Sequence, residues 1–186
     1  KFVRRHRWPM LAAAVALGLL VASQVTTELA RRAADRRFSQ LRDLSSEVLV
    51  LDSRLVNVEG TVAAREALAA MSLKYLSGLA ADARSDRALL FEVIDHYIRV
   101  AEIQGVPTSP SLGKLDEAEV TLATADGLVE GLLAARANDV RGLELSAMIR
   151  TYRTILADSQ SRDADANRHL DGAIARVDAL LAHPDV

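Results

Sequence analysis

Apolar residues recur every three or four positions along most of this chain, a spacing that predicts amphipathic helices rather than strands. The first stripe lies between about residues 36 and 58. Further helices are predicted to start near Thr61, Ser85 or Asp86, Leu115, Asn138 or Asp139, and Ser161. The Pro- and Gly-rich segment GVPTSPSLG, residues 105–113, separates two of these helices rather than two domains. The pattern therefore predicts an all-α fold.

Each stripe also predicts which residues face a core. The helix after Thr61 would turn one face inward, formed by Ala64, Leu68, Met71, Tyr75 and Leu79. The helix that Gly105 ends would bury Leu89, Val93, Tyr97 and Val100, and the one after it Leu115, Ala118, Leu122, Ala125, Val129 and Leu132. In the last two helices the expected core positions are Leu145, Met148, Tyr152 and Ile155, followed by Leu170, Ala173, Val177 and Leu180.

Helices of this length with short breaks predict an array of antiparallel helix pairs. The segment YIRVAEI from Tyr97 has a counterpart in YRTILAD from Tyr152, and small residues lie on the helices that follow. Tetratricopeptide repeats have large residues on one helix and small residues on the next, in units of about 34 residues. The separation of the two tyrosines exceeds one such unit, so we expect an irregular, tetratricopeptide-like array.

An uncharged apolar run, WPMLAAAVALGLLVASQV, lies near the start of the sequence. Its roughly 18 residues would extend about 27 Å as a helix, close to the hydrocarbon thickness of a bilayer. We expect a transmembrane helix at residues 9–27, after a basic segment at 1–8 and before a helical stalk at 28–60 and a helical domain at 61–186. The residues expected to contact lipid are Trp8, Leu11, Val15, Leu19 and Leu20. The alternative is a secretory signal peptide cleaved after Val21-Ala22-Ser23.

Charge bears on orientation and on partners. Four basic residues precede Trp8 and four arginines follow the apolar run, so the count alone does not decide the orientation. The first group directly adjoins the run, which favours a single-pass protein with most of the chain outside the cytoplasm. The whole chain has a net charge of −2 and its basic start is uncompensated, so the remainder is acidic and poorly suited to nucleic acid. There is no cysteine, so neither disulfides nor thiolate metal sites are expected.

Candidate catalytic and ligand motifs are incomplete. Gly113-Lys114 resembles the end of a phosphate-binding loop, but Leu115 replaces the required Ser or Thr. Asp163, Asp165 and Asn167 imitate the start of a calcium loop that lacks its Gly and its bidentate Glu. The remaining candidates lack a partner at metal-ligand or catalytic spacing: His6, His96, His169, His183 and Asp95. We expect these 186 residues to be non-catalytic and to hold neither cofactor nor metal.

The remaining candidate sites are binding surfaces. A stack of helix pairs forms a groove suited to a peptide or a partner helix. We expect the Pro-rich loop to lie at its edge, with Val106, Pro107, Pro110 and Leu112 as candidate partner contacts. Phe91, Tyr97, Met148 and Tyr152 are interpreted as core residues, with ligand contact as the alternative. Besides the bilayer, the expected partner is a protein or peptide, and a homodimer is an open alternative.

The sequence from Thr61 to Ala125 resembles the ectodomain of bacterial membrane-bound serine/threonine protein kinases with tetratricopeptide-like repeats. The similarity lies in the basic Trp-Pro entry RRHRWPMLAAA, in Ala64-Arg65-Glu66-Ala67-Leu68, in Tyr75-Leu76 with Leu79-Ala80, and in a group around the Pro-rich loop: Tyr97, Arg99, Val100, Glu102, Ile103, Gln104, Gly105, Pro107, Leu112 and Gly113. It extends to about Ala135. Ala101 replaces a common Gly, and Lys114 a common acidic residue.

This resemblance implies that the chain is the transmembrane and partner-binding region of such a kinase, whose catalytic domain would precede Lys1 in the cytoplasm. Binding or dimerisation outside would be relayed inward through the helical stalk. The alternatives are a membrane-anchored or secreted helical scaffold without a kinase, and the ectodomain of a membrane-bound transcriptional regulator.

Overall fold

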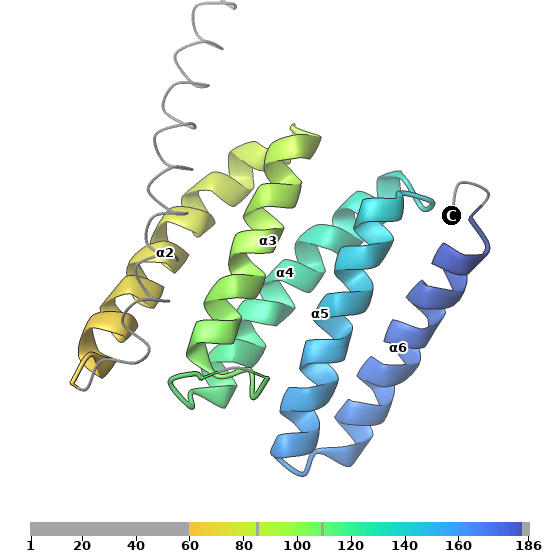
Figure 1. The fold of residues 1–186 in the computed structure, drawn as a ribbon. Helices are drawn as coiled ribbons and strands as arrows, with labels where there is room; N and C mark the ends of the chain where they lie inside the picture. Colours follow the sequence, from red (N-terminus) through yellow and green to blue (C-terminus); the bar gives the residue numbers. More distant parts are fainter. Residues whose placement is uncertain (1–59, 85, 109, 184–186) are drawn as a thin grey trace, which may run out of the picture. The chain divides into compact units, whose positions relative to one another are not determined.

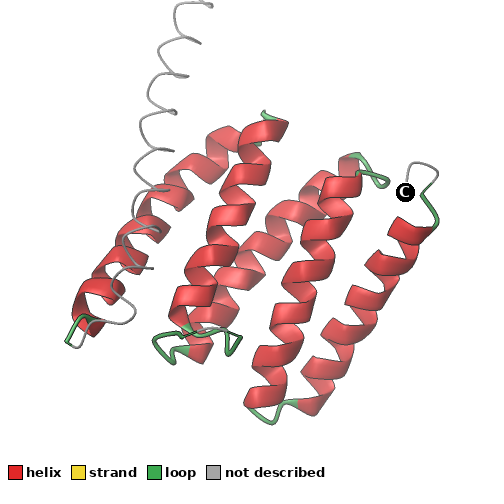
Figure 2. Cartoon of the chain, viewed as in Figure 1, coloured by secondary structure: helices red, strands yellow, loops and turns green. Residues whose placement is uncertain are grey.

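The computed structural model describes residues 60–84, 86–108 and 110–183, all of which belong to a compact unit spanning residues 45–186. These residues form five α-helices joined by short loops, and no strand occurs among them (Figures 1 and 2). The helices are α2 (Val62–Ala83), α3 (Arg87–Gln104), α4 (Leu115–Ala135), α5 (Val140–Ser159) and α6 (Asp163–Leu181). The predicted all-α class is confirmed for this part of the chain.

Each helix packs against the next one along the chain, and α3 also contacts α5. Successive helices run in opposite directions, so the loops alternate between the two ends of the array (Figure 1). As a result α3 lies between α2 and α4, and α5 lies between α4 and α6. This alternation creates two equivalent positions, one between α2 and α4 and one between α4 and α6.

The helix boundaries follow from local capping. The Asp86 side chain accepts hydrogen bonds from the backbone N–H groups of Ala88 and Leu89, at 3.0 and 3.2 Å, as expected of an N-cap. Asp139 caps α5 in the same way, accepting from the Gly142 N–H at 2.9 Å. Gly105 ends α3 as predicted. Thus the predicted starts of α3 and α5 are confirmed, and the structure selects Asp86 and Asp139 from each pair of candidates.

The central helices bury most of the predicted residues, whereas the predicted core residues Leu89 and Leu115, at the starts of α3 and α4, are only half-buried. On α3, Val93, Tyr97 and Val100 are buried, and on α4 the residues Ala118, Leu122, Ala125, Val129 and Leu132 are buried. Leu145 of α5 is fully buried. Its other predicted core residues, Met148, Tyr152 and Ile155, are only half-buried, because α5 packs through Ser146, Ile149 and Leu156 as well.

The two outer helices of this array differ from the prediction. α2 packs against α3 through a face that is offset from the predicted stripe, and leaves Met71 and Tyr75 exposed; its buried residues are Arg65, Ala69, Ser72, Leu76, Leu79 and Ala83. On α6, Ala173 is buried as predicted, but Leu170 and Val177 are exposed. In both helices the most apolar stripe is not the one that packs inside the described part of the chain.

The loop between α3 and α4 is tied to its surroundings by backbone hydrogen bonds. Leu112 N–H donates to the Ile103 carbonyl at 2.9 Å, and Lys114 N–H donates to the Gln104 carbonyl at 2.8 Å. The Arg65 guanidinium of α2 donates to the Pro110 carbonyl at 3.2 Å. A Cβ on Gly105 would lie 2.7 Å from the Lys114 backbone, so glycine is required for this close approach.

In the part of the chain that the structure describes, no helix has the length and hydropathy that a bilayer crossing needs. The predicted crossing at residues 9–27, the basic segment before it and the stalk after it lie outside the described residues, apart from Gly60. The same holds for the predicted lipid contacts Trp8, Leu11, Val15, Leu19 and Leu20.

Candidate binding groove between α2 and α4

A hollow of about 800 Å³ lies between α2 and α4, with α3 at its base. Leu90 and Tyr97 of α3 contribute apolar surface. The remaining lining residues come mainly from α2, α4 and the turns that follow them: Ser77, Ala80, Arg84, Arg87, Thr124, Gly127, Leu128, Gly131, Leu132, Ala135 and Arg136. A volume of this size lies within the range of ligand sites in proteins.

Small residues form the wall that α4 contributes. Thr124, Gly127, Gly131 and Ala135 follow helical spacing and all line the hollow. A Cβ added at Gly127 or Gly131 would meet no atom within 4 Å, so both positions open into free space. The two glycines, which reduce helix propensity, therefore do not serve contact with a neighbouring helix of the described array. They leave room for another backbone to approach α4 closely.

Three arginines lie at one end of the hollow. Arg87, at the start of α3, forms an ion pair with Asp139 at 2.6 Å and lies over the Phe91 ring, 5.1 Å from its centre. Arg84 and Arg136, which directly follow α2 and α4, make no ion pair in the described part of the chain. None of the described residues that line the hollow is an Asp or a Glu. Because Arg87 is paired with Asp139, Arg84 and Arg136 are the basic groups left to meet an acidic ligand.

Tyr97 adds a polar group to this apolar base. The side chain is buried, and burial raises the pKa of its phenol, so the hydroxyl stays protonated at neutral pH. Its hydroxyl makes no hydrogen bond with any of the described residues. A buried tyrosine usually satisfies this group, so the hydroxyl is available to an occupant of the hollow.

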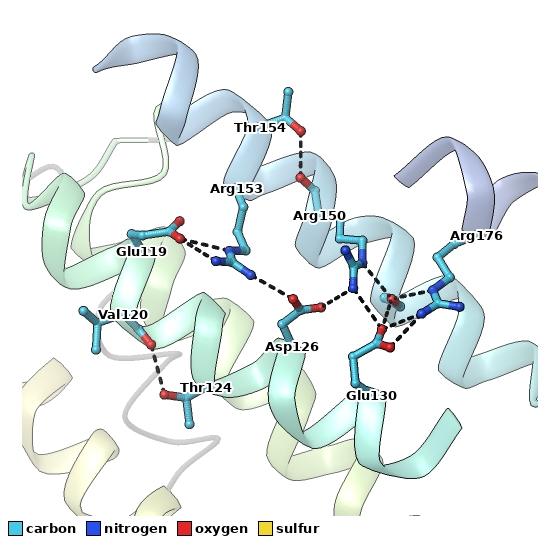
Figure 3. Close-up of polar contacts among 10 residues, drawn as sticks. Glu119, Val120, Thr124, Asp126, Glu130, Arg150, Arg153, Thr154 and Arg176 are labelled. Carbon is cyan, nitrogen blue, oxygen red and sulfur yellow. Dashed lines mark hydrogen bonds and ion pairs between the residues drawn. The ribbon is translucent and has the colours of Figure 1, made fainter. Parts of the chain in front are cut away.

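The equivalent position between α4 and α6 is filled by charged side chains (Figure 3). Glu130 of α4 forms ion pairs with Arg150 of α5 at 3.2 Å and with Arg176 of α6 at 2.7 Å. It also accepts a hydrogen bond from the fully buried Ser146 hydroxyl at 3.0 Å. One carboxylate thus joins three helices.

A second part of this network joins α4 and α5 (Figure 3). Arg153 pairs with Glu119 at 2.7 Å and with Asp126 at 2.8 Å, and Arg150 lies 3.6 Å from the other oxygen of Asp126. Tyr152, on the same helix, donates a hydrogen bond to Glu102 of α3 at 2.8 Å. Burial and, after it, the Glu102 carboxylate raise the pKa of Tyr152 to about 12.

The electrostatics of the network indicate a structural role. Burial alone would raise the Glu130 pKa, but hydrogen bonds from Arg150, Arg176 and Ser146 outweigh burial and lower it. The Glu130 carboxylate is therefore ionised and held by guanidinium groups at neutral pH. His169 of α6 is buried nearby, and its pKa is lowered by burial and then by the charge of Arg153. These charges hold α4, α5 and α6 together rather than leaving a reactive group free.

The predicted loop contacts lie at the end of the array opposite the three arginines of the hollow. Pro107 and Pro110 are exposed, Leu112 is half-buried, and Val106 is fully buried, so Val106 packs in the core instead of meeting a partner. None of the four lines the hollow between α2 and α4, whereas Leu112 lines a smaller hollow of about 500 Å³ beside the start of α2. The loop therefore borders this second hollow, which α2 and the start of α4 also line.

The other sequence candidates that lie within the described residues do not form a cluster that could hold a metal ion, and His6 lies outside those residues. Asp95 pairs with Arg141 at 3.0 Å, whereas the neighbouring His96 ring contacts the Glu92 carbonyl of its own helix. Asp165 pairs with Arg168 at 2.9 Å. Sequence reasoning missed Arg84 and Arg136, although each follows directly after a predicted helix. The small residues Gly127 and Gly131 indicate from the sequence a place of close backbone approach, and in the structure they form the open wall of the hollow. The signal for the wall was the presence of two helix-disfavouring residues within one strongly periodic helix.

These observations define, for residues 60–183, an all-α module of consecutively packed antiparallel helices with an open, arginine-lined groove between α2 and α4. Comparison with protein families, with curated proteins and with solved structures finds no match to this chain.

Proposed function

We propose that the helical domain is a partner-binding module and that the hollow between α2 and α4 receives a peptide segment of a protein partner. The observation that carries this proposal is a hollow of about 800 Å³ whose described lining includes three arginines and no carboxylate. Two of those arginines, Arg84 and Arg136, are without an ion pair in the described chain. The segment that fits is apolar along its length and acidic at the arginine end.

The lining explains why a peptide suits this hollow. A wall of Thr124, Gly127 and Gly131 lets a peptide backbone approach α4, and Leu90 offers apolar contact from α3. The Tyr97 hydroxyl can hydrogen-bond a peptide carbonyl or carboxylate. A guanidinium group binds carboxylate oxygens with two parallel hydrogen bonds, which gives the arginine end its preference for Asp or Glu.

At the level of the whole protein, we propose that the chain is the transmembrane and sensor region of a bacterial serine/threonine kinase. The helical domain would be a tetratricopeptide-like array outside the cytoplasmic membrane, and partner binding or dimerisation would be relayed through the stalk. The support is the resemblance from Thr61 to Ala125, the apolar run at residues 8–25, and an all-helical domain of antiparallel pairs.

Filling the hollow tests the proposed site. Gly131→Leu places a side chain into open space on the wall, whereas Gly78→Leu on α2 also enters open space but does not line the hollow. The probe is a pool of fluorescent peptides with Ala, Ser and Leu at variable positions and two fixed Glu, titrated with the purified 186-residue chain. We expect Gly131→Leu to abolish the anisotropy change and Gly78→Leu to retain it. Equal binding by both variants would refute the site.

Charge reversal tests the proposed specificity. The double variant Arg84→Glu with Arg136→Glu should lose the Glu-containing pool and bind a matched pool in which the two fixed residues are Lys. Each exposed ion pair contributes up to about 1 kcal/mol, so two pairs predict roughly a tenfold preference. A wild-type chain that binds both pools equally would show that the arginines do not select the partner.

The relay is tested in the intact gene product. Inserting Gly-Pro after Ala33 would interrupt the predicted continuous helix between the membrane and the domain. We expect partner-dependent kinase activity to be lost while partner binding is retained. Unchanged signalling after the insertion would refute the relay without affecting the binding groove.

A further inference from the structure

The outward face of α6 carries an apolar stripe. Leu170, Ile174, Val177 and Leu181 are 45%, 50%, 45% and 73% exposed. Their spacing of four, three and four positions places them on one side of the helix, from its middle to its C-terminal end. Exposed apolar residues that occur singly are ordinary on protein surfaces, but four in one continuous stripe indicate a contact surface.

This stripe is separate from the face by which α6 packs on α5. The packing face consists of Ala166, His169 and Ala173, which are buried, and of Gly172, where an added Cβ would lie 2.6 Å from the Arg150 side chain. The outer helix of a stacked helical array normally presents a polar face to water. Among the described helices α5 packs on α6, and the face of α6 that α5 leaves uncovered carries the four apolar residues.

Acidic residues flank the stripe on its free side. Asp171 and Asp178 are exposed and seven positions apart, so they lie on the same side of α6, adjacent to the apolar residues. Neither forms an ion pair within the described part of the chain. The nearby basic residues point elsewhere, since Arg168 pairs with Asp165 and Arg176 pairs with Glu130 across α5.

We propose that this α6 face binds an amphipathic helix of a partner protein whose apolar stripe is flanked by Lys or Arg. The partner helix would pack on α6 as α6 packs on α5. Its apolar residues would cover the four exposed side chains, and its basic residues would lie opposite Asp171 and Asp178. This surface lies outside the hollow between α2 and α4, so it is a second binding surface.

Charge distinguishes this partner from two other occupants. In a two-fold, antiparallel pairing of two α6 helices, Asp171 and Asp178 of one copy would face the same residues of the other, which is unfavourable. Helices that lie on membrane surfaces carry Lys and Arg beside their apolar face, and an acidic flank is repelled by anionic lipid.

The test uses two synthetic helical peptides with the same Leu stripe, one flanked by two Lys and the other by two Glu, titrated with the full 186-residue chain. We expect the Lys peptide to bind at least about fivefold more tightly, because two ion pairs replace two like-charge contacts. In the variant Asp171→Lys with Asp178→Lys this preference should reverse. The variant Ile174→Asp with Val177→Asp should bind neither peptide.

These substitutions change exposed residues, so far-ultraviolet circular dichroism should match the wild-type chain. The variant Gly131→Leu in the hollow serves as the matched control and should keep the preference for the Lys peptide. Equal binding of both peptides, no binding of either, or binding that survives Ile174→Asp with Val177→Asp would overturn the proposal. Loss of a wild-type dimer in the Ile174→Asp variant during sedimentation would also overturn it, in favour of a second copy.

Discussion

Replacing Glu130 with Gln is the most direct test of how α4, α5 and α6 are held together. The substitution keeps the size of the side chain and removes its charge. It leaves Arg150 and Arg176 without the carboxylate to which both donate, and their side chains are only 20% and 28% exposed. The Gln amide also brings a hydrogen-bond donor toward two guanidinium groups, which cannot accept.

The expected loss of stability lies between two known limits. Breaking a fully buried ion pair costs about 3–5 kcal/mol, whereas an exposed pair contributes about 0–1 kcal/mol. Glu130 itself is 37% exposed, so solvent screens part of the interaction. Arg150 retains Asp126 at 3.6 Å, which reduces the loss further. We therefore expect the free energy of unfolding to fall by about 1–3 kcal/mol at pH 7.

The assay is urea unfolding of the purified chain followed by circular dichroism, with Glu144→Gln as the control. Glu144 forms an exposed pair with Arg141, which keeps Asp95, so this change should cost less than about 0.5 kcal/mol. The Glu130 pKa is lowered in the folded state, so its contribution is complete above the usual value of 4.5 and is lost as pH falls through the folded pKa. The gap between wild type and Glu130→Gln should therefore narrow below pH 4.5. If the free energies of unfolding of wild type and Glu130→Gln agree within about 0.5 kcal/mol at pH 7, the network adds no stability.

Three further changes test other parts of the fold. Gly105→Ala should destabilise the chain by about 1–3 kcal/mol, because the added Cβ would lie 2.7 Å from the Lys114 backbone. The control is Gly78→Ala, which should be neutral or stabilising in the same urea assay because its Cβ would meet no atom within 4 Å. His169 has a lowered folded pKa and binds protons more readily when unfolded, so stability should fall as pH drops below 6.5, and His169→Gln should lack this slope in thermal melts at several pH values. Ser161 has a φ of 57°, so Ser161→Gly should stabilise by up to about 1 kcal/mol, and a lower melting temperature would contradict this expectation.

The sequence pattern predicted helix positions well because the boundaries depend on local chemistry. Asp86 and Asp139 cap their helices through hydrogen bonds within three residues, and Gly105 ends α3. The core faces of α3 and α4 were also predictable. Both helices are covered by neighbours on two sides, so their dominant apolar stripe has to be internal.

The binding groove was not predictable in the same way. Two of its arginines, Arg84 and Arg136, come from the turns after α2 and α4, and their proximity depends on how α3 spaces those helices. The ion pairs of Glu130 have the same origin, since Arg150 and Arg176 are 20 and 46 positions away in sequence. Spacing rules within one helix carry no information about such contacts between helices.

The faces of α2 and α6 show a different limit of pattern reasoning. A stripe such as Leu170, Ile174 and Val177 indicates that a helix face favours exclusion from water. It does not indicate whether the surface that covers this face belongs to the same chain or to a partner. α6 is held on α5 by small residues and by the Arg176–Glu130 pair, which leaves its largest apolar residues on the outer side. An error in predicting the buried face of an outer helix is therefore informative: it marks the surface where a partner helix is expected.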